Sequence, residues 1–378
     1  MKSSQTRLNS IDALRGLAAL TIVFYHARSL LWAGLGQTWK RYGLSADINA
    51  WLGYATAPLY FGGLAVELFF VLSGYCIHRR GAQNLATNPN AQLNLKQFAF
   101  RRLWRLYPTY FVALCITALV DTYVRAYHPM QVRLGQDNSF FAFCMSLLSL
   151  QGLAAPTFGS NTVFWTLALE LHLYAVYPLL YYISRKHGPI KALGITWLVS
   201  LIYVVVDMLL DMSNMFPYGG SGGPIFLPYW FTWAFGFYIA EVEAGRASLP
   251  KKFWLIAVIG AILAVPISLL RLWDLARFSS TLGFGGLVYW SITPKGNYFW
   301  SFSLGRFLAG IGLFSYSLYA VHRPCLLMFK VTVAPTGQQF ISLIPTLIGA
   351  MIAVIAAWFL FMLVEQWTLK PLSWKGKS

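Results

Sequence analysis

The chain has 378 residues, of which 57% are hydrophobic and only 11% charged, and its formal net charge is +17. Soluble domains carry about 25% charged residues, so a water-facing surface cannot easily be built from this composition. The mean hydropathy of +0.56 points the same way. These values exclude a disordered chain, disfavour a soluble enzyme, and predict a polytopic membrane protein.

Ten segments are candidates for membrane-spanning helices, each of which needs about 20 mainly apolar residues. They are residues 11–32, 57–77, 106–127, 163–184, 190–211, 226–245, 253–271, 274–292, 308–333 and 341–364. A further apolar stretch, residues 140–153, is too short to span and is predicted to be a re-entrant or interfacial helix. The ninth segment contains Arg323 and Pro324, where the helix is expected to break. The expected fold is therefore an all-α polytopic membrane protein with about ten transmembrane helices.

The positions of the basic residues favour one orientation in the membrane. With a cytoplasmic N-terminus, 18 Lys and Arg residues fall in inside segments and six in outside segments. Cytoplasmic loops of membrane proteins carry such an excess. We therefore expect both termini to be cytoplasmic, with a transmembrane domain over 1–367, a basic cytoplasmic tail over 368–378, and a longest cytoplasmic loop over 78–105. Because the positive charge flanks the membrane, no nucleic-acid partner is expected.

The four cysteines lie in apolar stretches without a CxxC pair. This spacing predicts neither a disulfide framework nor a zinc site. No metal and no permanently bound cofactor are expected.

Ionisable residues at bilayer depth are costly and are functional candidates by default. His26 follows Arg15 by eleven residues, so both lie on one helix face, about 16.5 Å apart along the axis. Glu67 precedes His78 by eleven residues on the next, antiparallel helix, so it falls at the depth of His26. This depth matching predicts that the Glu67 carboxylate orients His26 as a general base. A buried polar contact between helices, without a catalytic role, is the alternative.

A second set of residues is expected to line an acceptor pocket. Glu170 follows Trp165 at the outer start of the fourth predicted span, and His322 follows Tyr319 where the ninth is expected to break. Broken helices at membrane depth usually line a cavity. A buried histidine that only makes structural hydrogen bonds is an equally open interpretation of His322. Ser73, which precedes a glycine, is expected to allow close helix packing rather than to act as a nucleophile, because no nucleophile-elbow sequence surrounds it.

A basic cluster precedes the third predicted span. Arg102 and Arg105 are three residues apart, so they can face the same anion, and guanidinium groups bind phosphate bidentately. Arg15, Arg79 and Arg80 are expected beside them at the inner surface. This arrangement suits a cytoplasmic nucleotide-bearing donor such as a coenzyme A thioester. A membrane anchor that follows the positive-inside bias is the alternative.

Five blocks of sequence occur in the order typical of one family. They are residues 8–26, 66–75, 101–108, 164–170 and 315–324. In these blocks the chain resembles the acyltransferase-3 family, polytopic membrane proteins that O-acylate cell-surface glycans and other small acceptors. The resemblance implies an essential His26 eleven residues after Arg15, a motif of Arg102 and Arg105 near the acyl donor, and about ten helices with both termini inside.

The expected function is that of an integral membrane O-acyltransferase. It would move an acyl group, expected to be acetyl, from cytoplasmic acyl-CoA to a hydroxyl of a surface polysaccharide or lipid-linked glycan. Its expected location is the bacterial cytoplasmic (inner) membrane. The alternative is a proton-coupled transporter or flippase, since ionisable residues at depth and an interrupted helix suit that function too. The sequence leaves open the identity of the acceptor, the length of the acyl chain and the oligomeric state. It also leaves open whether transfer is direct or passes through an acyl-histidine intermediate.

Overall fold

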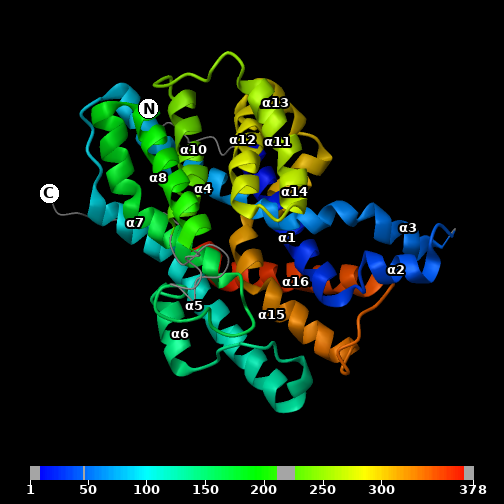
Figure 1. Cartoon of the computed structure of the whole chain (residues 1–378). Coiled ribbons are helices and arrows are strands. Elements are labelled where there is room, and N and C mark those ends of the chain that lie inside the picture. The colour runs from blue at the N-terminus through cyan, green and yellow to red at the C-terminus, as the bar shows by residue number, and fades with distance from the viewer. Residues whose placement is uncertain (1–8, 46, 211–225, 370–378) are drawn as a thin grey trace.

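The computed structural model describes residues 9–45, 47–210 and 226–369, whose regular structure is helical apart from isolated β-bridges (Figure 1). The longer helices gather into one body, and the short helices α2 and α3 extend from it as an arm. The elements are α1 (Asn9–Leu31), α2 (Leu35–Tyr42), α3 (Ile48–Ala55), η1 (Ala57–Leu64), α4 (Ala65–Thr87), α5 (Leu95–Tyr127), η2 (Pro129–Gln131), α6 (Phe140–Leu147), α7 (Phe164–His187), α8 (Pro189–Leu210), α10 (Leu227–Glu243), α11 (Phe253–Leu269), α12 (Trp273–Ile292), α13 (Pro294–Phe299), α14 (Ser303–Leu313), α15 (Ser315–Val333), α16 (Ile344–Leu360), η3 (Phe361–Glu365) and α17 (Gln366–Thr368).

Helices occupy the ten predicted apolar segments, and the short helix α6 occupies the start of the stretch predicted to be re-entrant or interfacial. Within the described residues, four helical segments are long and apolar enough to cross a membrane, or five if a bent pair counts as one span. They are Ile48–Thr87, Leu95–Tyr127, Pro189–Leu210 and Ile344–Thr368, and the bent pair is α14 with α15. The all-α prediction is therefore confirmed, whereas the count of ten spans stays a prediction. Most of the predicted tail, residues 370–378, lies outside the described residues.

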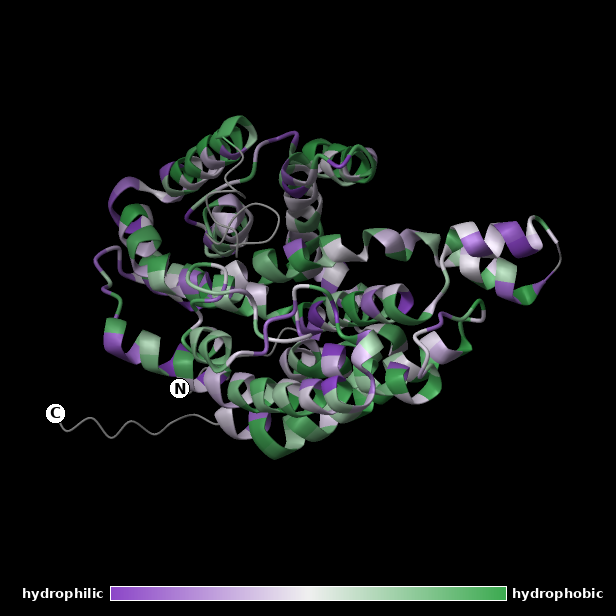
Figure 2. Cartoon of the chain, turned by 60° about the horizontal axis from the view of Figure 1, so that its bottom comes forward, coloured by the Kyte–Doolittle hydropathy of each residue, from purple (hydrophilic) through white to green (hydrophobic). Residues whose placement is uncertain are grey.

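Many large apolar residues are exposed on several helices. Figure 2, coloured by hydropathy, shows that hydrophobic residues make up much of these helices. On α11, for example, Leu255, Ile262 and Leu269 are each more than half exposed. Contiguous apolar faces of this kind mark contact with a membrane or a partner. Together with the length and apolarity of the spanning helices, they indicate a membrane protein.

The predicted break in the ninth segment is displaced. The bend of 73° lies between α14 and α15, at Phe314, and not at Arg323 and Pro324. Pro324 lies inside α15, where its missing N–H frees the carbonyl of Ala320. Asn161 Nδ2 donates to that carbonyl at 2.8 Å, which satisfies it and lets α15 continue.

The predicted loop over residues 78–105 is also mostly helical. Helix α4 continues to Thr87 and α5 begins at Leu95, so only residues 88–94 join them. Leu, Arg and Gln are good helix formers, which explains why the polar ends of both spans extend the helices. The basic cluster is therefore presented from a rigid helix, and Asn94 caps its start by accepting from Gln97 N at 3.0 Å.

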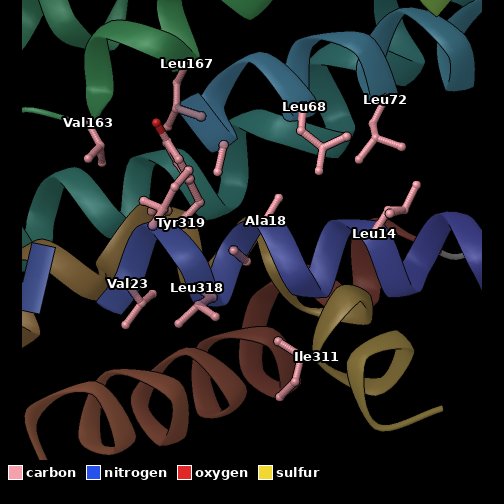
Figure 3. Packing of buried hydrophobic residues seen from close by; sticks show 14 of the residues in the cluster. Leu14, Ala18, Val23, Leu68, Leu72, Val163, Leu167, Ile311, Leu318 and Tyr319 are labelled. Atoms are coloured by element: carbon pink, nitrogen blue, oxygen red, sulfur yellow. The ribbon is translucent and has the colours of Figure 1, made fainter. Parts of the chain in front are cut away.

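Close helix crossings hold the core together. A Cβ atom on Gly74 of α4 would lie 1.9 Å from the carbonyl oxygen of Trp233 on α10, so no larger residue fits there. Gly16 of α1 makes the same approach to the Leu308 carbonyl on α14. Small residues at such crossings let membrane helices pack backbone to backbone. Figure 3 shows the result around α1, where buried residues of α1, α4, α7, α14 and α15 form one cluster.

Candidate functional site

Among the described residues, two cavities lie on either side of a shared wall. The first, here the arginine cavity, has a volume of about 140 Å³ and is lined by Arg15, Arg102 and Arg105 together with Ser73 and Glu170. The second, here the histidine cavity, has a volume of about 420 Å³ and is lined by His26, Glu67, Trp165 and Arg277. Val66 and Tyr319 line both cavities. The predicted basic and histidine candidates therefore lie in neighbouring chambers.

The partner of His26 is another histidine. His26 Nδ1 on α1 lies 2.8 Å from His322 Nε2 on α15, and the two rings stack with centroids 5.0 Å apart. His322 is fully buried, and its Nδ1 lies 2.9 Å from the carbonyl oxygen of Tyr319 and 3.1 Å from that of Leu318. His322 was predicted to line a pocket. In the structure it instead contacts His26 and fixes the orientation of that ring.

These contacts assign the tautomers of both rings. A carbonyl oxygen only accepts, so Nδ1 of His322 carries the proton and donates to the backbone. In a neutral His322, Nε2 then accepts, and Nδ1 of His26 must donate to it. The remaining ring nitrogen of neutral His26, Nε2, consequently keeps its lone pair. The pair is thus arranged to leave a basic nitrogen on the residue that lines the histidine cavity.

The predicted contact between His26 and Glu67 is not formed. Glu67 Oε1 instead lies 3.5 Å from Nε of Arg277 on α12, and both side chains are more than nine-tenths buried. Arg277 Nη1 donates to Asp274 at 2.6 Å, and Nη2 donates to the Tyr229 hydroxyl at 3.0 Å. A buried carboxylate is stabilised better by a cation than by a neutral imidazole, and Arg277 provides the cation for Glu67. Depth matching correctly placed Glu67 and His26 beside one cavity but assigned the wrong partner.

One oxygen of this ion cluster is unused. Glu67 Oε2 is buried and has no hydrogen-bond partner in the described part of the chain. A buried carboxylate oxygen left without a donor is costly and calls for a ligand or water. The cluster therefore offers an acceptor atom to whatever enters the histidine cavity.

The arginines of the arginine cavity differ in how firmly they are held. Arg105 donates to Glu365 at 2.7 Å, and that carboxylate is fully buried. Arg15 lies 3.8 Å from Asp12. Arg102 stacks over Phe98, and its Nε has no hydrogen-bond partner within the described ranges. Arg102 is therefore the guanidinium most available to an anionic ligand.

Glu170 lies in the arginine cavity rather than the acceptor pocket predicted for it. Its Oε1 accepts from Ser73 Oγ at 3.0 Å and from the Tyr174 hydroxyl. Ser73 Oγ in turn accepts from Trp233 Nε1 at 3.2 Å. These two hydrogen bonds occupy the Ser73 hydroxyl, through which Ser73 fixes Glu170 against α4.

Two of the predicted donor arginines lie elsewhere. Arg79 donates through Nε and Nη2 to Glu243 on α10, and Arg80 is exposed on α4. Neither belongs to the lining of the two described cavities. Glu243 neutralises Arg79 from α10, a helix distant in the sequence, so residue spacing could not predict this ion pair.

The sequence patterns do not predict Arg277 as a site residue. It lies near the start of the eighth candidate segment, residues 274–292. A signal existed, since Asp274 precedes it by three residues and a helical pair at that spacing brings the charges together. Both residues lie in the first two turns of α12, where the ion pair is drawn into the protein beside Glu67.

The helical fold with its apolar outer faces, together with a buried histidine pair beside an arginine-lined cavity, defines a membrane protein with a candidate active site. Residues 8–363 match the acyltransferase domain of the acyltransferase-3 family. The chain therefore belongs to the acyltransferase-3 family. This membership favours the acyltransferase over the transporter that the ionisable residues alone left open.

Three curated relatives are similar to parts of the chain. ORF330 of Acidianus two-tailed virus is 31% identical over 193 residues, covering 51% of this chain and 46% of the relative. The peptidoglycan O-acetyltransferase OatA of Listeria monocytogenes is 26% identical over 229 residues, covering 57% and 31%. The acyltransferase MdmB of Streptomyces mycarofaciens is 25% identical over 221 residues, covering 58% and 50%. The chain thus spans half or less of the length of each, and no solved structure matches it.

Proposed function

We propose that the protein transfers an acyl group from cytoplasmic acyl-CoA, with acetyl-CoA as the expected donor, to a hydroxyl of a surface polysaccharide or lipid-linked glycan. The observation that carries the proposal is the pair of cavities that meet at Val66 and Tyr319, one lined by arginines and the other by the oriented His26. Family membership supports the reaction class.

The donor binds through the arginine cavity. Arg102 and Arg15 contact its phosphates, while Arg105 is already paired with Glu365 and mainly shapes the wall. The pantetheine arm then runs along α1 toward His26. Eleven residues of helix separate Arg15 from His26, about 16.5 Å along the axis, which is of the same order as an extended pantetheine arm.

The chemistry follows from the tautomers. His26 Nε2 takes the proton of the acceptor hydroxyl as its oxygen bonds to the acyl carbon, and the carbon–sulfur bond breaks. The proton passes to the departing thiolate, so the products are the ester and coenzyme A. During the step His26 is cationic, and His322 Nε2 continues to accept from its Nδ1. This is the role that was predicted for Glu67.

The acceptor binds in the histidine cavity. Its wall combines few charged groups with many aromatic rings, the usual make-up of a small-molecule site. The rings belong to Tyr25, Tyr60, Phe61, Trp165, Tyr229 and Trp273. The free Oε2 of Glu67 accepts a hydrogen bond from an acceptor hydroxyl next to the one that is acylated.

The membrane arrangement that accompanies this function has about ten spans and cytoplasmic termini, in a bacterial inner membrane. The excess of basic residues in the inside segments supports it. The arginine cavity then opens toward the cytoplasm and the histidine cavity toward the opposite side.

Replacing Arg102 by alanine is expected to raise the KM for acetyl-CoA by about 10–100-fold, since a charge-assisted hydrogen bond to phosphate contributes about 1.5–3 kcal/mol. Steady-state kinetics of the purified protein measure this. The matched control is Arg101→Ala, because Arg101 is the exposed neighbour on α5 and lines neither cavity. Equal donor KM values in the two variants would reduce Arg102 to a membrane anchor.

Glu67→Gln is expected to raise the KM for the acceptor at least about 10-fold while the KM for acetyl-CoA stays within about twofold, because the change touches only the histidine cavity. Glu243→Gln is the matched control, since this carboxylate also pairs with an arginine but lies outside both cavities. A rise in donor KM with an unchanged acceptor KM would contradict this assignment.

A further inference from the structure

The wall shared by the two cavities is built from few side chains. Among the described residues, only Val66 on α4 and Tyr319 on α15 line both cavities. Phe69, one turn after Val66, lines the arginine cavity and packs edge-on against the Tyr319 ring at 5.7 Å between centroids. A donor that reaches His26 from the arginines must therefore move its acyl group past Val66 and Tyr319.

Tyr319 is held in place on several sides. A hydrogen bond of 2.7 Å joins its hydroxyl to Thr166 Oγ1 on α7, and its ring meets the His322 ring edge-on at 5.8 Å. It is 8% exposed, and Figure 3 shows it in the same packed cluster as Val163 and Leu167. Its carbonyl also accepts from His322 Nδ1. The ring is thus a fixed part of the wall, next to the residue that orients His26.

We propose that Val66 and Tyr319 form a partition that limits the acyl group to a short chain. This inference rests on the proposed function and adds the residues that determine donor specificity. The partition separates a cavity of about 140 Å³ from one of about 420 Å³, and the acyl group must pass it to reach His26, so every methylene added to the acyl chain must pass the same two side chains. In a close-packed apolar site, one added methylene changes the preference between two substrates by about 10–200-fold.

The test compares kcat/KM for butyryl-CoA and acetyl-CoA in the purified full chain. Val66→Ala and Tyr319→Phe open the partition, the first by removing two methyl groups and the second by releasing the ring from Thr166. Val163→Ala is the control for the first, because Val163 lines only the histidine cavity. Tyr316→Phe is the control for the second, because Tyr316 lines only the arginine cavity and donates to the Leu106 carbonyl.

At least one partition variant is expected to raise the butyryl-to-acetyl ratio about 10-fold or more, while each control changes the ratio by less than about twofold, whatever happens to the overall rate. Ratios that are equal in partition and control variants would overturn the partition. A wild-type protein that transfers no acyl group from either thioester would overturn the proposed function itself, and the partition with it. A variant that fails to fold is recognised by its thermal unfolding in detergent. The butyryl-to-acetyl ratio of the other partition variant then tests the proposal.

Discussion

Replacing His26 by alanine is expected to lower kcat for acyl transfer by about 10²–10⁴-fold, the usual contribution of a general base. The KM for acetyl-CoA should stay within about twofold of the wild-type value, because His26 does not line the arginine cavity. The measurement is ester formation by purified protein with labelled acetyl-CoA and a hydroxyl acceptor. Loss of rate with retained donor binding places His26 in the chemical step.

The control for this loss is His187→Ala, which removes an exposed imidazole at the end of α7. Its kcat should match that of the wild type. A His26→Ala protein that inserts normally and still acylates at the wild-type rate would remove the general base from the mechanism.

The second large effect is expected at His322. His322→Phe keeps a ring against His26 but removes the nitrogen that accepts from His26 Nδ1. We expect kcat to fall about 10–100-fold, as is typical when a residue that orients a functional histidine is lost. Both KM values should change little, since His322 lines neither cavity.

A conservative variant separates orientation from packing. The side-chain amide oxygen of His322→Gln can accept from His26 Nδ1, so this variant should recover part of the rate that His322→Phe loses. If kcat falls equally in the Phe and Gln variants, the His322 ring only fills space and does not fix the tautomer of His26.

The sequence predicted the depth of the site better than its contacts. Helix rise placed His26 and Glu67 level with each other, and both line the histidine cavity. Rise does not fix which way a helix is turned toward its neighbours, so spacing could not show that Glu67 faces Arg277. The actual partner of His26 is 296 residues away along the chain, and only packing of α15 against α1 brings it near.

The same reason accounts for Glu170. Its position near the outer start of the fourth segment suggested an acceptor site, but α7 presents it to the arginine cavity beside Ser73. The basic cluster was more predictable, since Arg102 and Arg105 share a helix face and both line one cavity. Neutralisation of Arg79 by Glu243 depended on a tertiary contact.

Inside-out membrane vesicles, whose cytoplasmic face is turned outward, test whether donor and acceptor reach His26 from opposite sides of the membrane. Labelled acetyl-CoA is added outside and the hydroxyl acceptor is enclosed, and the labelled ester is measured. The two-cavity account predicts that wild-type protein forms ester across the membrane and that His26→Ala does not. Ester that forms only when donor and acceptor are supplied on the same side would contradict it.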